Sequence, residues 1–237
     1  MNKNESERLE AIAENSIYAK GTNKATIEYC AKVFDRFIKG DSILELGPAE
    51  GLMTEKIYRD DIHYEVVEGS SHFCEIISSK FPSIVVNNQL FEQYQPERVF
   101  DTIILGHVLE HVEEPAIILS KIVGWLKEGG VVLAAVPNSR SIHRQAAVLM
   151  GLLDSEKSMS EKDHRHGHRR IYDPESLRND FMHAGFRIEA SGGYWLKPVS
   201  DRQIESDWND QMLDAFMALG ERYPDIAGEI YVVGKKR

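Results

Sequence analysis

Residues 42–51 read SILELGPAEG, a short apolar run that breaks into a turn containing Gly47 and Gly51. The apolar run has the length and composition of a buried strand, and the apolar spacing that resumes at Leu52 predicts a helix to about Tyr58. Glycine in such a turn lets the backbone approach a ligand closely. A tight strand-to-helix turn also favours glycine for its geometry alone. This stretch by itself therefore predicts a strand, a turn and a helix, but not a bound ligand.

The same alternation of strand and helix patterns extends along the chain. Apolar runs predict further strands at 63–68, 83–87, 100–106, 131–137, 186–191 and 230–236. Helical patterns occupy about 5–18, 23–40, 70–80, 115–130, 139–153, 174–185 and 206–222. Continuous apolar strands separated by helices are typical of a parallel sheet covered on both faces. The sequence therefore predicts an α/β fold with a doubly wound, Rossmann-like core.

The length of 237 residues suits one α/β domain with additions and is short for two independent domains. Three additions are expected: N-terminal helices within 1–40, and segments 139–170 and 193–228. The core then comprises 41–138, 171–192 and 229–237. Additions at the carboxyl edge of such a sheet commonly shape the substrate pocket, so we expect the two later segments to form a helical lid.

Composition argues against several function classes. The formal net charge is -10, and an acidic surface repels phosphate backbones, so no nucleic-acid partner is expected. No apolar run approaches the roughly 20 residues that span a bilayer, and the N-terminus lacks the apolar segment of a secretory signal. Two cysteines do not make a disulfide framework. We expect a cytoplasmic monomer or homodimer with no membrane partner.

Glu68 ends the predicted strand 63–68, about twenty residues after Gly47. A carboxylate at this position can accept hydrogen bonds from both hydroxyls of a ribose. Turn and acid together favour an adenosine-containing ligand, either a nicotinamide dinucleotide or S-adenosyl-L-methionine (SAM). The dinucleotide alternative needs G-x-G-x-x-G, which Pro48 and Ala49 do not supply.

Five segments in chain order resemble the class I SAM-dependent methyltransferases, in the branch that includes ubiquinone-biosynthesis O-methyltransferases and many natural-product and sugar methyltransferases. They are ELGPAEG (45–51), VVEGS (66–70), FDTIILGHVLEHVEEP (100–115), LKEGGVVLAAVPN (126–138) and YDPESLRNDFMHAGF (172–186). The resemblance spans about residues 41–191. It implies a mostly parallel sheet with an antiparallel last strand, SAM as the cofactor, and methyl transfer as the activity.

The resemblance also implies cofactor contacts in the turns that follow the strands. These are Glu45, Gly47, Pro48 and Gly51 for the methionine part, Glu68 and Gly69 for the ribose, Leu90 and Phe91 near the adenine, Gly106 and His107 at the sulfonium, and Tyr18 closing over the cofactor. Two positions depart from the family pattern. Ala49 stands where a middle glycine is usual, and Asn88-Gln89 stand where an acid often follows the third strand.

Methyl transfer from a sulfonium depends mainly on holding the acceptor in line, because the methyl group is already activated. An acceptor that carries a proton also needs a base, and histidine titrates near neutrality. The candidate catalytic histidines are His107, His111, His166 and His168. We expect His168 to face the acceptor, whereas a structural role is the alternative for His111.

The segment 164–170 reads HRHGHRR, an island of basic groups in an acidic chain. Guanidinium groups grip phosphates and carboxylates, so the expected acceptor-binding residues are His164, Arg169, Arg170 and Tyr172. The alternatives are that Arg165, Arg169 and Arg170 pair with the acids of 154–163 or form a solvated face.

His107, Glu110 and His111 are spaced i, i+3 and i+4, which would place three ligating side chains on one face of a helix. A histidine from 164–168 could complete a divalent metal site there. This is the alternative to a metal-free enzyme, which is the primary expectation.

The sequence thus predicts a SAM-dependent enzyme that methylates an oxygen or nitrogen atom of a small metabolite, a sugar or natural-product intermediate. Two alternatives stay open. One is a methyltransferase that acts on a nucleic-acid end or a protein. The other is a SAM-binding partner protein without catalysis.

Overall fold

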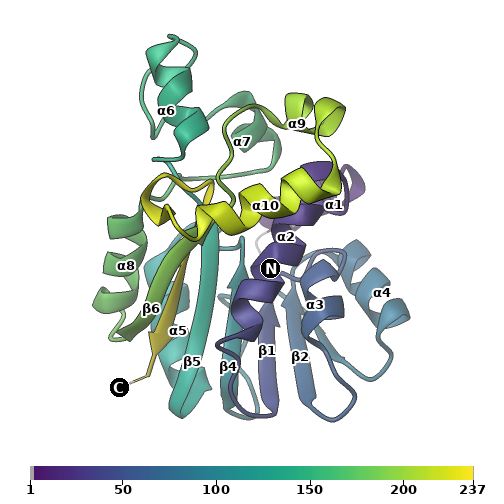
Figure 1. Cartoon of the computed structure of the whole chain (residues 1–237). Coiled ribbons are helices and arrows are strands. Elements are labelled where there is room, and N and C mark those ends of the chain that lie inside the picture. Colours follow the sequence, from purple (N-terminus) through teal and green to yellow (C-terminus); the bar gives the residue numbers. More distant parts are fainter. Residues whose placement is uncertain (1–2, 237) are drawn as a thin grey trace.

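The computed structural model describes residues 3–236, and within them seven strands form one sheet in the order β3-β2-β1-β4-β5-β7-β6 (Figure 1). The strands are β1 Ser42–Leu46, β2 His63–Glu68, β3 Val85–Asn88, β4 Phe100–Gly106, β5 Leu126–Pro137, β6 Arg187–Tyr194 and β7 Glu229–Lys235. Strand β7 runs antiparallel to β5 and β6, while the pairs among β1 to β5 are parallel. The predicted α/β fold with an antiparallel last strand is confirmed. The ends of the predicted segments 1–40 and 229–237, residues 1–2 and 237, lie outside the described residues.

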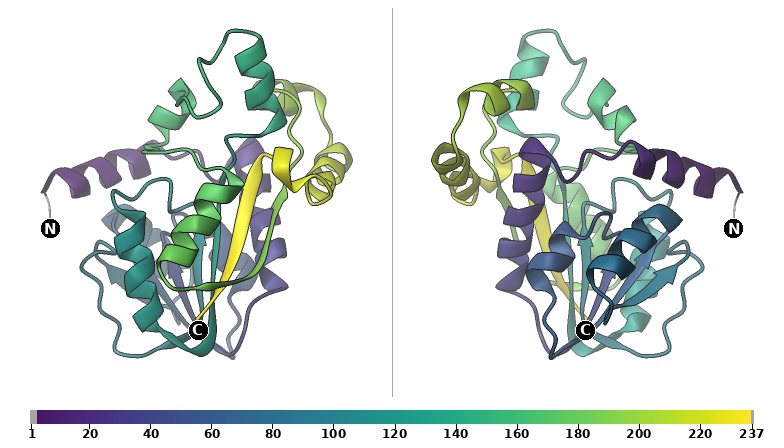
Figure 2. Two further views of the ribbon diagram at one scale, coloured as in Figure 1. Left: turned by 90° about the vertical axis from the view of Figure 1, so that its left-hand side faces the viewer. Right: turned by 90° about the vertical axis from the view of Figure 1, so that its right-hand side faces the viewer.

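Helices pack against both faces of the sheet (Figures 1 and 2). One face is covered by α2 Gly21–Asp35, α3 Leu52–Ile57 and α4 Ser71–Lys80, and the other by α5 Pro115–Trp125 and α8 Pro174–His183. Two groups of buried apolar side chains fill the two interfaces, with Phe34 and Met53 in the first group and Leu119 and Phe181 in the second. The sheet is therefore buried on both sides, as its continuous apolar strands predict.

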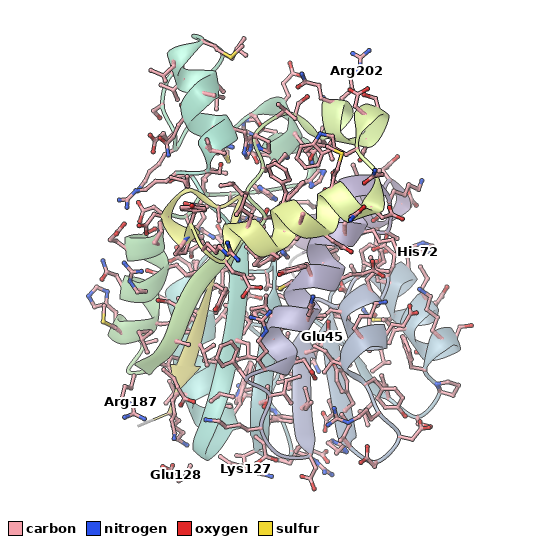
Figure 3. All side chains as sticks on the ribbon, viewed as in Figure 1. Glu45, His72, Lys127, Glu128, Arg187 and Arg202 are labelled. Carbon is pink, nitrogen blue, oxygen red and sulfur yellow. The ribbon has the colours of Figure 1, made fainter. Side chains whose placement is uncertain are left out.

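A further group of helices lies over the carboxyl ends of the parallel strands (Figure 1). It consists of α6 Ile142–Leu149, α7 Glu161–Arg165, α9 Asp201–Asp207, α10 Asp210–Gly220 and the short η1 Pro224–Ile226. Helix α1 Lys3–Glu14 lies at the side of this end of the sheet (Figure 2), and Lys127 and Glu128 mark the opposite end (Figure 3). In the part of the chain described, no helix combines the length and apolar character of a membrane span.

Local sequence signals set several element boundaries. The Ser70 hydroxyl caps α4 by accepting a hydrogen bond from the Phe73 amide at 3.3 Å. Helix α8 begins at Pro174 behind a capping box formed by Asp173 and Ser176.

Two predictions for the helices were wrong. The helix predicted for 115–130 ends at Trp125, because Leu126 pairs with Phe100 of β4 and is buried in the sheet. The polar segment 154–170 was given no helix, yet it contains α7, which begins with a capping box between Ser160 and Asp163. A polar segment without apolar periodicity does not predict a helix, and here the capping box is the feature that marks the start of α7.

Strand β4 provides a test of the sheet core. Ile103 is fully buried in this strand, so Ile103→Ala removes buried methyl groups and leaves a cavity. We expect the free energy of unfolding to fall by about 2–5 kcal/mol in urea titrations followed by circular dichroism. The matched control Ile117→Ala, at a position that is 49% exposed on α5, should change it by less than about 0.5 kcal/mol. Equal losses in both variants would contradict this packing.

Candidate functional site

A first cavity opens at the carboxyl ends of β1, β2 and β4. Eight of the residues predicted to contact the cofactor line it: Tyr18, Glu45, Gly47, Pro48, Glu68, Phe91, Gly106 and His107. Gly69 and Leu90 line an adjoining cavity that shares Glu68 and Phe91 with the first. Gly51 lines neither cavity and shapes the turn instead.

The turn after β1 forms one wall of the first cavity and depends on left-handed backbone. Gly47 has φ 64°, Ala49 φ 48° and Gly51 φ 78°. Gly51 needs glycine for its left-handed conformation, and a Cβ atom there would also lie 2.6 Å from Ile77 Cδ1, which would have to move. Ala49 adopts the left-handed region at a cost of roughly 1–2 kcal/mol, and its amide donates to Glu68 Oε2 at 3.4 Å.

The Glu68 carboxylate lies buried at the end of β2. Its Oε1 accepts a hydrogen bond from the Ser70 amide at 2.9 Å. Burial is the largest influence and raises the pKa of Glu68 to about 7, although hydrogen bonds from the Ser70, Ala49 and Gly69 amides oppose that shift. Each carboxylate oxygen has two lone pairs, so both oxygens can accept a further hydrogen bond. The site therefore suits a ligand that brings two hydroxyl donors, such as a ribose.

Glu45 (labelled in Figure 3) is the second buried acid of the first cavity. Its Oε2 accepts hydrogen bonds from Thr54 Oγ1 at 2.6 Å and from the Tyr64 hydroxyl at 2.8 Å. Burial outweighs these two hydrogen bonds and raises the pKa of Glu45 to about 7. The other oxygen is left available to a ligand in the cavity.

A second cavity adjoins the first and is bounded by the helices over the sheet. Tyr18, Ile27, His107 and His111 line both cavities. The rest of the lining is mostly polar and includes Asn138, His143, Arg144, Lys162, Asp163, His166, His168, Lys197, Asp201 and Glu229. The four predicted catalytic histidines, His107, His111, His166 and His168, thus come together at this cavity.

His107 sits directly after β4 with left-handed backbone, φ 59°. Its Nε2 lies 3.1 Å from the Tyr194 hydroxyl, and its Nδ1 lies 3.6 Å from both Glu110 Oε1 and Glu229 Oε2. Burial opposes protonation, but Cys30 and the two carboxylates outweigh it and hold the pKa of His107 well above its usual range. A protonated imidazole between two buried acids suits charge compensation better than proton acceptance.

The other three histidines differ in their partners. Burial lowers the pKa of both His111 and His166 to about 4, so both rings are neutral near pH 7. His166 Nε2 is buried and has no hydrogen-bond partner among residues 3–236. His168 Nδ1 lies 3.2 Å from Asp163 Oδ1, and its ring meets His111 edge to face at 4.8 Å between centroids.

The predicted helical arrangement of His107, Glu110 and His111 is wrong, because residues 107–111 form an irregular turn. The left-handed backbone at His107 directs its ring toward Tyr194 and Glu229. Instead, ligating atoms of Glu110, His111 and His168 all lie within 4.8 Å of one another.

The residues predicted to bind the acceptor lie outside the second cavity. His164 is exposed, and Tyr172 is buried with its hydroxyl donating to Asp180 at 3.0 Å. Arg169 pairs with Glu5 at 2.8 Å, and Arg170 donates to backbone carbonyl oxygens of the loop after β4. Arg169 also donates to the His111 carbonyl oxygen at 2.9 Å, so both guanidinium groups brace this loop. Of the three arginines in 164–170, Arg165 pairs with an acid of 154–163, Glu161, at 3.3 Å.

Sequence reasoning missed the residues of α1 that line the first cavity and two charged residues that line the second. Arg8, Leu9 and Ile12 of α1 line the first cavity, and the weak apolar stripe of segment 5–18 was the only signal for them. Lys197 and Asp201 line the second cavity, and no local motif marks them.

Comparison with known proteins identifies the family of the chain. A family model described as a methyltransferase domain matches residues 18–191. The chain belongs to this methyltransferase family. The ubiquinone biosynthesis O-methyltransferase of Xylella fastidiosa (strain 9a5c) is 24% identical over 200 residues, covering 79% of this chain and 77% of that protein.

Solved structures show the same fold as this methyltransferase. A SAM-dependent methyltransferase from Thermotoga maritima, described as a possible histamine N-methyltransferase, aligns with a TM-score of 0.63 at 16% identity, covering 99% of this chain and 95% of that one. The N-methyltransferase NodS of Bradyrhizobium japonicum, in complex with S-adenosyl-L-homocysteine (SAH), aligns with a TM-score of 0.62 at 12% identity, covering 98% and 97%. The protein is a class I SAM-dependent methyltransferase, and SAM is its cofactor.

Replacing Glu68 should change the stability of this methyltransferase and its affinity for the cofactor in opposite directions. Because the pKa of Glu68 is raised from 4.5 to about 7, its stabilising contribution is complete below pH 4.5 and is lost as pH rises through about 7. We expect Glu68→Gln to raise the free energy of unfolding more at pH 8 than at pH 5. The same variant should bind SAH at least about tenfold more weakly in calorimetry, since hydrogen bonds to a charged group are lost.

The exposed acid Glu75 on α4 supplies the control for this prediction. Glu75→Gln should leave both the pH dependence of stability and the SAH affinity as in the wild type. An unchanged SAH affinity in Glu68→Gln would refute the ribose role.

Proposed function

We propose that the protein transfers a methyl group from SAM to an oxygen or nitrogen atom of a small polar metabolite, a sugar or natural-product intermediate, bound in the second cavity. The observation that carries this proposal is the shared lining of the two cavities by Tyr18, Ile27, His107 and His111. An acceptor in the second cavity would meet the methyl group at this junction. SAM supplies an activated methyl group, so the residues of the chain need chiefly to position the acceptor.

The lining of the second cavity favours a hydrophilic acceptor. Buried atoms without hydrogen-bond partners among the described residues include Oε2 of Glu229 and Nδ1 of His143, which both line this cavity. Buried polar atoms are normally satisfied, so these atoms call for a ligand with several hydroxyl or amino donors. A sugar or other polyol meets that requirement better than an apolar ring does.

The acceptor proton is taken up by His166 in this proposal. The sequence favoured His168, but Nδ1 of that ring lies 3.2 Å from Asp163 Oδ1 and the ring packs edge to face against His111. His166 is neutral near pH 7, and its Nε2 is free to accept a proton. Its ring also meets Tyr18 edge to face at 5.7 Å between centroids, which places it next to the junction of the cavities.

Methyl-labelled SAM tests this function. Incubation with a panel of sugars, amino sugars and polar natural-product intermediates should transfer label to at least one of them. With that acceptor, His166→Ala should lower kcat by about 10²–10⁴ while the SAH affinity stays unchanged. The control His183→Ala, at an exposed position on α8, should leave kcat as in the wild type.

Two outcomes would overturn parts of the proposal. SAH binding without label transfer to any member of the panel would favour a non-catalytic SAM-binding protein. Label transfer with a wild-type kcat in His166→Ala would remove the base role from this residue.

A further inference from the structure

Glu110, His111 and His168 form a cluster of metal-ligating side chains at the second cavity. One carboxylate oxygen of Glu110 and one ring nitrogen of each histidine lie within 4.8 Å of one another. Two of these residues come from the loop after β4 and the third from the segment after α7. The loop and the segment are joined by a hydrogen bond from the Arg169 amide to the Glu110 carbonyl oxygen at 2.8 Å, so the ligands are held in place without an ion.

The Glu110 side chain is the strongest indication that something binds here. Its side chain is 1% exposed, and neither of its oxygens has a hydrogen-bond partner in the described part of the chain. A buried carboxylate without hydrogen bonds is costly and is usually paired or bound to a metal. The nearest cationic group is His107, whose Nδ1 lies 3.6 Å away and is shared with Glu229. One imidazole is thus shared between two carboxylates, so Glu110 has no cationic partner of its own among the described residues.

The surroundings of His168 match those of a metal-binding histidine. Histidine ligands generally donate their second ring N–H to a carboxylate, which fixes the ring and its tautomer. His168 Nδ1 lies 3.2 Å from Asp163 Oδ1 but is not aligned for a hydrogen bond, so Asp163 provides the neighbouring carboxylate, and Nε2 would face an ion once the ring donates to it. Asp163 is fixed in turn by the capping box with Ser160 and by Arg144 at 3.1 Å. The carboxylate that orients His168 is therefore itself rigid.

We propose that Glu110, His111 and His168 bind a Zn²⁺ ion, whose open coordination position faces the second cavity and receives a hydroxyl oxygen of the acceptor. Two imidazoles and one carboxylate are a usual ligand set for catalytic zinc, which keeps one position open. Mg²⁺ and Ca²⁺ prefer oxygen ligands, so two histidines select against them. The proposal rests on the proposed function, and it narrows the acceptor atom to oxygen.

Metal binding to the whole chain tests the site without an acceptor. Protein freed of metal with a chelator is dialysed against Zn²⁺ or Mg²⁺, and bound metal is measured by mass spectrometry. The wild type should bind one Zn²⁺ per chain and melt at a higher temperature with Zn²⁺ bound, and it should retain no Mg²⁺ after dialysis. Glu110→Gln and His168→Ala should each weaken Zn²⁺ binding at least about tenfold. Co²⁺ in place of Zn²⁺ should give a visible absorption band in the wild type that these variants lose.

His164→Ala is the matched control, because His164 lies in the same segment as His168 but is exposed and lies outside the second cavity. It should bind Zn²⁺ and Co²⁺ as the wild type does. SAH should still raise the melting temperature of all three variants, which shows that they are folded and that the cofactor site is intact. Zn²⁺ binding that is absent in the wild type, or equal in the wild type and Glu110→Gln, would overturn the site, whereas loss of the SAH response in the wild type would overturn the methyltransferase proposal itself.

Discussion

The chain reversal at residues 47–51 is the constraint on which the site depends. The Gly47 amide donates to the Val67 carbonyl oxygen at 2.9 Å, which ties the start of the turn to β2. The Ala49 amide then points at Glu68, and Gly51 starts α3 against Ile77. Three left-handed residues within five positions are needed for this path. The same backbone that connects strand to helix thus forms one wall of the first cavity and donates a hydrogen bond to the acid at the end of β2.

Buried carboxylates dominate the energetics of the site. Glu45, Glu68 and Glu229 each have a pKa raised to about 7, mainly by burial, so each destabilises the fold when it is ionised. The sheet cores on both faces must offset that cost. These buried carboxylates lower the stability of the fold, but they are already dehydrated and correctly placed for binding a ligand. This accounts for buried acids at the carboxyl edge, while the interior of the sheet itself is apolar.

The fold could be predicted from the sequence where one local signal decided it. Strands β1, β2 and β4 and helix α4 begin and end as predicted, because buried apolar runs, Gly47 and the Ser70 cap mark their boundaries. The lining of the first cavity could be predicted from the same signals, since parallel strands end at a common edge. The cluster of Glu110, His111 and His168 could not be predicted as such, because its members are far apart in sequence. Their convergence depends on the left-handed backbone at His107 and on the Arg169 to Glu110 hydrogen bond.

Helix α1 connects the two halves of the site. Glu10 accepts hydrogen bonds from the Ser71 amide and the Ser70 hydroxyl at the start of α4, next to Glu68. Two other contacts of the N-terminal residues, Arg8 to the Gly167 carbonyl oxygen and Glu5 to Arg169, hold the segment that carries His166 and His168. Leu9 and Ile12 of the same helix line the first cavity, so one helix contacts both this cavity and the segment that carries the two histidines. The two cavities therefore share a structural support in α1, through side chains that the N-terminal sequence alone did not mark as functional.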